Sequence, residues 1–309
     1  ANVVYALATV HEQAGYHEKA MESLSEALRS FKLNKDKGGS VKAYHSLAKL
    51  KASKAIESKS AVDRTGAIEC YREALRIRRQ MSVGDIDLAS ILYEYANLLC
   101  LNNDTEAALP LLEEALQTQK SKSGLKNELV AKILLQMAEV YVQQEKYDAS
   151  LVPLEQVLLI YNSLLPDGST NACIDMGLCY YLLGKTYRAQ GELQNAISSY
   201  LECIPLKLNK FGANSLECAI IHNELGEAYG KVEDFDKAIE SLVQALQVRK
   251  KELGNNSIEY GDSVFNLASE YKVFCFHFCP LNNSLSLWDF LSIRLRQRFM
   301  CTWVNMIRP

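Results

Sequence analysis

The sequence predicts an all-α fold, a solenoid in which helix hairpins stack on one another. Three observations lead to this prediction. Small residues recur at fixed distances, large apolar residues keep fixed offsets from them, and only 6 Pro and 15 Gly occur in 309 residues. So few obligatory turns favour long helices over many short strands. A hairpin that cannot bury its own apolar face becomes stable when neighbouring hairpins cover that face.

The first helix of each repeat is predicted from a small residue that lets a neighbouring helix approach closely. These residues are Ala8, Ala48, Ala96, Ala138, Gly184, Gly226 and Ala268. Three residues later, the last four repeats carry Tyr141, Tyr187, Tyr229 and Tyr271. The spacing between successive small residues settles at 42.

The second helix is predicted from another small residue, which lies 12 positions after the first in all but one repeat. These residues are Ala20, Ala67, Ala108, Ser150, Ala196 and Ala238. Large residues follow after four positions and mostly small ones after seven, which places all of them on one helix face. In the second repeat the distance is 19, and the seven extra residues predict longer helices or a protruding polar loop. Gly212 and Gly254 are predicted to lie in turns between repeats, where glycine can adopt positive φ.

On these residues the chain resembles the tetratricopeptide repeat family, as in "YALATVHEQAGYHEKAMESLSEAL" and "HNELGEAYGKVEDFDKAIESLVQAL". The 42-residue repeat, with Leu253-Gly254 and Phe265-Asn266-Leu267-Ala268, is similar to the kinesin light chain subtype. The resemblance implies a right-handed α-α superhelix over residues 1–272, with six repeats and the first helix of a seventh. It also implies a scaffold whose concave groove, lined by first helices, binds partner peptides.

The family's groove positions, carried over repeat by repeat, combine cations, amides and tyrosines. The candidates are Lys42, His45, Lys49, Tyr93, Asn97, Lys132, Gln136, Tyr181, Lys185, Arg188, Asn223 and Asn266. Phe265 and four carboxylates, Glu94, Glu139, Glu224 and Glu227, occupy groove positions as well. Lys185 and Arg188 are expected to be exposed, and Arg188 to bind a ligand carboxylate through two donors.

This set predicts an extended peptide partner with acidic and aromatic residues, which is the peptide class that kinesin light chains bind. The resemblance thus points to a cargo adaptor. Chaperone adaptors of the family instead clamp a C-terminal carboxylate, and Glu94 and Glu224 stand where their clamp residues would be. Motor association is not supported, because no heptad pattern precedes Tyr5. Two alternatives stay open: a regulatory or targeting module of a larger protein, an enzyme included, and a self-assembling structural repeat protein.

The composition narrows the remaining function classes. A net charge of -3 argues against a strongly basic nucleic-acid binder, although it leaves room for a local patch. The sequence has no run of 18 apolar residues, so no transmembrane helix is predicted. Nine Cys at irregular spacing predict reduced thiols in the cytoplasm. No phosphate-binding loop, nucleophile elbow or zinc-protease motif occurs, so no enzyme activity, cofactor or metal is expected.

Residues 273–309 depart from the repeat and form an atypical tail. Both Trp and three of the nine Cys lie there, and Cys275-x-His277-x-Cys279 holds possible zinc ligands without a second pair. Three interpretations stay open. In the first, the tail is not native coding sequence, since Lys272-Val273 is compatible with an unspliced intron donor. In the second, the tail caps the last repeat. In the third, residues 285–300 form a membrane-surface or partner-binding helix.

Overall fold

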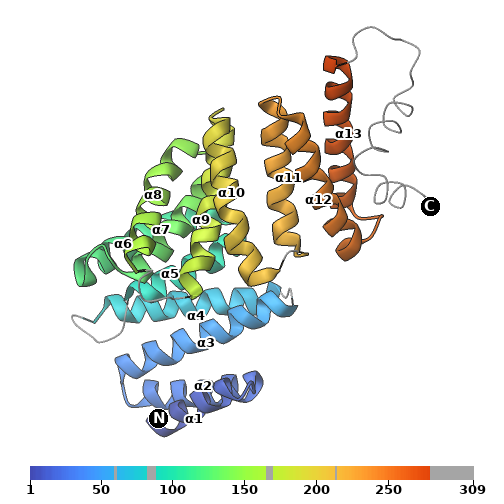
Figure 1. The fold of residues 1–309 in the computed structure, drawn as a ribbon. Coiled ribbons are helices and arrows are strands. Elements are labelled where there is room, and N and C mark those ends of the chain that lie inside the picture. Colours follow the sequence, from blue (N-terminus) through green and yellow to red (C-terminus); the bar gives the residue numbers. More distant parts are fainter. Residues whose placement is uncertain (59–60, 82–87, 165–169, 213, 279–309) are drawn as a thin grey trace. The chain divides into compact units, whose positions relative to one another are not determined.

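The computed structural model describes residues 1–58, 61–81, 88–164, 170–212 and 214–278 (Figure 1). All regular structure in these residues is α-helical, as predicted. The helices divide between two compact units, residues 1–169 and residues 170–309. We call these the N-terminal unit and the C-terminal unit.

The N-terminal unit contains four helix hairpins, one for each of the first four repeats. Its first helices are α1 (Asn2–Gln13), α3 (Lys37–Ser58), α5 (Leu88–Leu101) and α7 (Glu128–Gln143). Its second helices are α2 (His17–Leu33), α4 (Ala61–Arg79), α6 (Thr105–Ser123) and α8 (Tyr147–Leu164). One apolar core runs through these hairpins from Ala8 to Val140, because each hairpin covers the apolar face of the next.

In the part of the C-terminal unit that the structure describes, there are two complete hairpins and one further helix. The hairpins are formed by α9 (Thr170–Ala189), α10 (Leu193–Phe211), α11 (Leu216–Lys231) and α12 (Phe235–Leu253). They are followed by α13 (Ile258–Phe278), which continues six residues beyond Lys272. Residues 279–309, with Cys279 of the Cys-His-Cys motif, lie outside the described residues, as do the side chains of Cys275 and His277.

The predicted packing positions are confirmed. All six second small residues are fully buried, and the residues four and seven positions later are at most 2% exposed. Six of the seven first small residues are buried as well. Ala268 on α13 is exposed, in contrast to its six counterparts.

A close approach of α9 and α10 in the C-terminal unit explains one glycine. A Cβ atom at Gly184 would lie 2.4 Å from Cε1 of Tyr200, which is shorter than any tolerated contact. The fully buried ring of Tyr200 therefore uses the space that a side chain at position 184 would need.

The second repeat extends both of its helices, which decides between the two predicted alternatives. Helix α3 continues ten residues past Ala48, whereas α1 ends five residues past Ala8. Helix α4 begins six residues before Ala67, whereas α2 begins three before Ala20. The extra residues thus lengthen the hairpin at its tip.

Two further expectations can be compared with the backbone and the helices. Gly212 and Gly254 have φ of 83° and 81° in turns between repeats, as predicted. Within the described part of the chain, no helix is long and apolar enough to cross a membrane.

Candidate functional site

The predicted groove residues lie on the first helices, and five of the twelve candidates belong to two polar clusters, one in each unit. The sequence placed residues on each helix but did not predict which side chains contact one another. Each cluster contains a glutamate that accepts a hydrogen bond from a tyrosine of a second helix.

The cluster in the N-terminal unit is built around Glu94 of α5. His45 Nε2 on α3 donates to Glu94 Oε2 at 2.6 Å, and Lys49 Nζ lies 3.5 Å from Glu94 Oε1. The hydroxyl of Tyr71 on α4 donates to Glu94 Oε2 at 3.4 Å. We call these four residues the Glu94 cluster. It joins three successive helices of the second and third repeats through partly buried polar groups.

The bases around Glu94 control its ionisation. Burial alone would raise the pKa of Glu94. The hydrogen bond and charge of His45, together with the charge of Lys49, outweigh burial and hold the pKa below the ordinary glutamate value. Glu94 is therefore a carboxylate at neutral pH. It already neutralises part of the positive groove charge that was predicted to attract an acidic ligand.

The other candidates of this unit remain outside the Glu94 cluster. Lys42 is exposed and, among the described residues, makes no ion pair. Lys132 pairs with Glu128 one turn earlier at 2.7 Å. Gln136 donates to Glu139 at 3.0 Å, and burial raises the pKa of Glu139.

The other two candidates of this unit, Asn97 and Tyr93, lie on α5. The Oδ1 atom of Asn97 is buried and accepts no hydrogen bond from any described residue. An unsatisfied buried acceptor is costly until a donor reaches it. The ring of Tyr93 is half-buried and packs against the apolar core.

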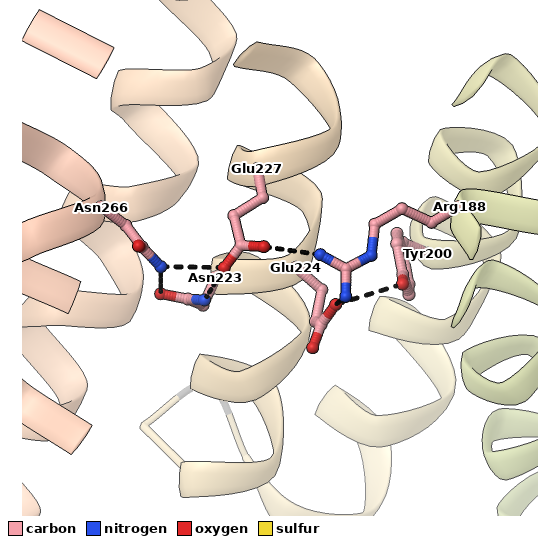
Figure 2. A network of polar contacts seen from close by, with 6 residues as sticks. All are labelled: Arg188, Tyr200, Asn223, Glu224, Glu227 and Asn266. Carbon is pink, nitrogen blue, oxygen red and sulfur yellow. Dashed lines mark hydrogen bonds and ion pairs between the residues drawn. The ribbon is translucent and has the colours of Figure 1, made fainter. Parts of the chain in front are cut away.

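The cluster in the C-terminal unit is built around one guanidinium (Figure 2). Arg188 of α9 contacts Glu224 Oε2 at 2.7 Å through Nη2 and Glu227 Oε2 at 2.5 Å through Nη1. Tyr200 donates to Glu224 Oε2 at 3.4 Å. This guanidinium thus ties α9 to two carboxylates on α11.

The same network continues to α13 through two amides. Asn223 Nδ2 donates to Glu227 Oε1 at 2.8 Å, and Asn266 Nδ2 donates to the same oxygen at 2.8 Å. Asn266 Nδ2 also lies 3.3 Å from Asn223 Oδ1. We call Arg188, Tyr200, Asn223, Glu224, Glu227 and Asn266 the Arg188 cluster. It connects the first helices of three successive repeats.

Burial and a neighbouring negative charge together raise the pKa of Glu224. Burial is the largest influence and raises the pKa of Glu224. Arg188 opposes burial, but Glu227 adds a second negative charge nearby, and the pKa ends above the ordinary value. The charge of Glu227, after burial, also raises the pKa of Glu270 on α13. This surface therefore has more acid than base.

The expected exposure of Arg188 and Lys185 needs correction. The side chain of Arg188 is 22% exposed, and its guanidinium contacts carboxylates of its own chain. Binding of a ligand carboxylate by Arg188 stays a prediction. Asn223 is 8% exposed, and its amide is already used by Glu227. Lys185 is half-buried, with Nζ 5.9 Å from the ring centre of Tyr181. The sequence analysis did not predict these contacts, because it placed each glutamate in the groove by itself. It did not pair Glu224 and Glu227 with Arg188 of the preceding repeat.

Metal-binding side chains and cysteine thiols are the remaining groups with reactive potential among the described residues. No group of three or more His, Cys, Asp or Glu that could hold a metal is found among the described residues. The described cysteines are free thiols. Burial raises the pKa of Cys203 to about 12 and that of Cys100 to about 11, so both behave as core residues.

Comparisons with known proteins agree with this architecture. A tetratricopeptide repeat model matches residues 87–163 and 175–251, and a second such model matches residues 1–31. No curated protein matches the sequence. Among solved structures, BtubC (BKLC) from P. vanneervenii has a TM-score of 0.59 at 20% identity, covering 78% of this chain and 94% of its own.

A second similar structure comes from another organism. The nearly identical TPR-like repeats of a Podosopora anserina putative kinesin light chain have a TM-score of 0.52 at 17% identity. That match covers 68% of this chain and 95% of the other. At these identities both similarities show the fold alone.

Proposed function

The chain belongs to the tetratricopeptide repeat family, and on that premise we propose that it is a scaffold that binds extended partner peptides along its first helices. The observation that carries the proposal is the Arg188 cluster, in which polar groups from α9, α11 and α13 form one continuous network. Helix packing requires apolar contacts and does not require such a network. Its carboxylates and guanidinium are 17% to 32% exposed, so a peptide can compete for their hydrogen bonds.

The two units are proposed to favour peptide segments of different charge. In the N-terminal unit Lys42 is exposed, and Lys49 is 51% exposed at a loose 3.5 Å from Glu94. Acidic residues of a ligand fit there. In the C-terminal unit two glutamates share Arg188, so a third carboxylate would be repelled and backbone amides or basic residues fit better. A cytoplasmic cargo-adaptor role is the more specific form of this proposal.

A peptide array probed with the full chain tests the acidic preference. The double variant Lys42→Glu, Lys49→Glu should weaken binding of acidic peptides about tenfold, because close charge pairs across an interface are sensitive to reversal. The matched control is Lys146→Glu, Lys231→Glu, which reverses two exposed lysines elsewhere and should change binding less than about twofold. Equal binding by all three proteins would refute the acidic preference at this surface.

Self-assembly is a second candidate, favoured by one observation on α13. Ala268 is exposed there, and Phe265 and Val264 are 72% and 41% exposed. Light scattering should then show a mass that rises with concentration, and Phe265→Ser should lower it. A constant monomer mass would remove this candidate and leave peptide binding untouched.

A further inference from the structure

The N-terminal unit carries a strong positive charge at the edge where successive repeats are connected. Residues 29–37, 73–81 and 114–128 contain ten Lys and Arg but four Asp and Glu. The whole chain, by contrast, has a net charge of -3. We call these three segments the basic edge. Such a concentration of one sign gives a local field that attracts oppositely charged partners.

The hairpin topology brings the three segments together. Second helices run back along first helices, so α2, α4 and α6 end at the edge where α3 and α7 begin. A Cβ atom at Gly38 would lie 3.9 Å from Met81 Cε, which links the start of α3 to the end of α4. Arg79 Nη2 contacts Glu114 Oε2 at 2.5 Å, which links α4 to α6. In Figure 1 the α2–α3 connection and the end of α4 lie at the left of this unit.

Helix stability explains only part of this charge. Cations in the last turns of α4 and α6 stabilise those helix ends through the helix dipole. Lys37 is the first residue of α3, and Lys126 lies two residues before α7. Positive charge is unfavourable at a helix N-terminus. Both lysines are exposed, as is Lys35, and none of the three makes an ion pair within the described part of the chain.

The apolar residues of the basic edge indicate which partner would fit. Leu33 is 83% exposed and Leu125 is 57% exposed, each one or two residues from a lysine. Phe31, the one aromatic residue in the three segments, is 3% exposed, so the edge has no platform on which bases could stack. Two leucines on separate connections also offer little apolar surface for a bilayer. The combination fits a protein segment.

We propose that the basic edge binds an acidic segment of a partner protein that also carries leucine or a similar apolar residue. This surface is separate from the first helices, where Lys49 pairs with Glu94 and Arg188 pairs with two glutamates of α11. On the edge, Lys35, Lys37 and Lys126 have no such competitors among the described residues, so acidic ligands gain more there. A single partner could then use one segment at the edge and another along the first helices.

Fluorescence anisotropy with the full chain tests the proposal. The probe is a labelled synthetic peptide of acidic residues interrupted by leucine, with a second peptide that has serine in place of leucine. The edge variant is Lys35→Glu, Lys37→Glu, Lys126→Glu. The matched control is Lys146→Glu, Lys231→Glu, Lys272→Glu, which changes net charge equally at exposed lysines outside the edge. Circular dichroism of both variants checks that they fold.

The expected result is binding to the native chain that weakens with salt and falls about tenfold in the edge variant. The control should change it less than about twofold, and the serine peptide should bind more weakly. The variant Lys42→Glu, Lys49→Glu should leave this binding intact, so a failure here is distinct from a failure of the first-helix proposal.

Three results would overturn the proposal. One is the absence of binding to the native chain. Another is equal weakening in the edge and control variants, which would reflect net charge alone. The third is edge-dependent binding of oligothymidylate or of phosphatidylserine vesicles in preference to the peptide, which would assign the edge to nucleic acid or membrane.

Discussion

The Glu94 and Arg188 clusters share one arrangement of side chains, but the pKa of their glutamates shifts in opposite directions. In each, a buried tyrosine of a second helix donates to a glutamate on the next first helix, at 3.4 Å in both cases. The pKa of Glu94 is nevertheless lowered, whereas the pKa of Glu224 is raised. Equivalent repeat positions therefore do not give equivalent chemistry.

The difference comes from the number of charges around each glutamate. Glu94 has His45 and Lys49 to itself, so the bases outweigh burial. Glu224 shares Arg188 with Glu227, so burial and repulsion prevail. One repeat pattern thus yields a glutamate matched by its own bases in the N-terminal unit and two glutamates that share one guanidinium in the C-terminal unit.

The largest expected effect comes from removing the shared cation. Arg188→Ala leaves Glu224 and Glu227 partly buried and without their guanidinium, and should lower the local free energy of unfolding by about 2–3 kcal/mol. Lys49→Ala, at a more exposed and looser contact, should cost less than about 1 kcal/mol. Hydrogen exchange of amides in α9, α11 and α3 gives both values. Equal costs would show that the two clusters do not differ energetically.

A smaller effect is expected where α9 and α10 of the C-terminal unit approach each other at Gly184. Gly184→Ala places a Cβ atom against the ring of Tyr200, and should destabilise the hairpin by about 1–2 kcal/mol despite the better helix propensity of alanine. The second repeat holds Ala48 and Tyr71 at the corresponding positions of one hairpin, so the expected cost at Gly184 depends on where the ring of Tyr200 lies and not on the residue pair alone. Adding Tyr200→Leu to Gly184→Ala should relieve the overlap. A thermal melt in which Gly184→Ala gains stability would contradict the proposed steric limit.

The smallest effect is a difference in carboxyl titration, measured by carbon-13 NMR. Glu94 should titrate below the ordinary glutamate value of about 4.3 and Glu224 above it. The lowered pKa means that Glu94 stabilises the fold at neutral pH, and this contribution disappears as pH falls through that pKa. The raised pKa means that ionised Glu224 costs stability at neutral pH, and the cost disappears as pH falls through its pKa.

Neutralising the competing carboxylate provides the control for this titration. Glu227→Gln should lower the pKa of Glu224, because Arg188 then serves one carboxylate. An unchanged midpoint of Glu224 would mean that burial alone sets its pKa.

The sequence predicted packing much better than polar contacts. Buried positions such as Ala20 and Leu24 recur at fixed offsets because every hairpin must solve the same packing problem. The pairing of Arg188 with Glu224 and Glu227 crosses from one repeat to the next, and its partners are separated by more than 30 residues. A recurring signal does exist: Lys49 and Arg188 lie one and four residues after their small residues, and each is followed by a glutamate two residues before the next one.

The long hairpin of the second repeat has a consequence for how the protein tolerates change. Helix α3 runs five residues further past its small residue than α1 does, which adds about 7 Å of overhang at the tip. Both helices lengthen together there, while their other ends keep their contacts with adjacent hairpins. The second repeat therefore absorbs its extra residues at the hairpin tip. A reporter peptide or fluorescent domain inserted between α3 and α4 should leave both the first-helix surface and the basic edge in working order.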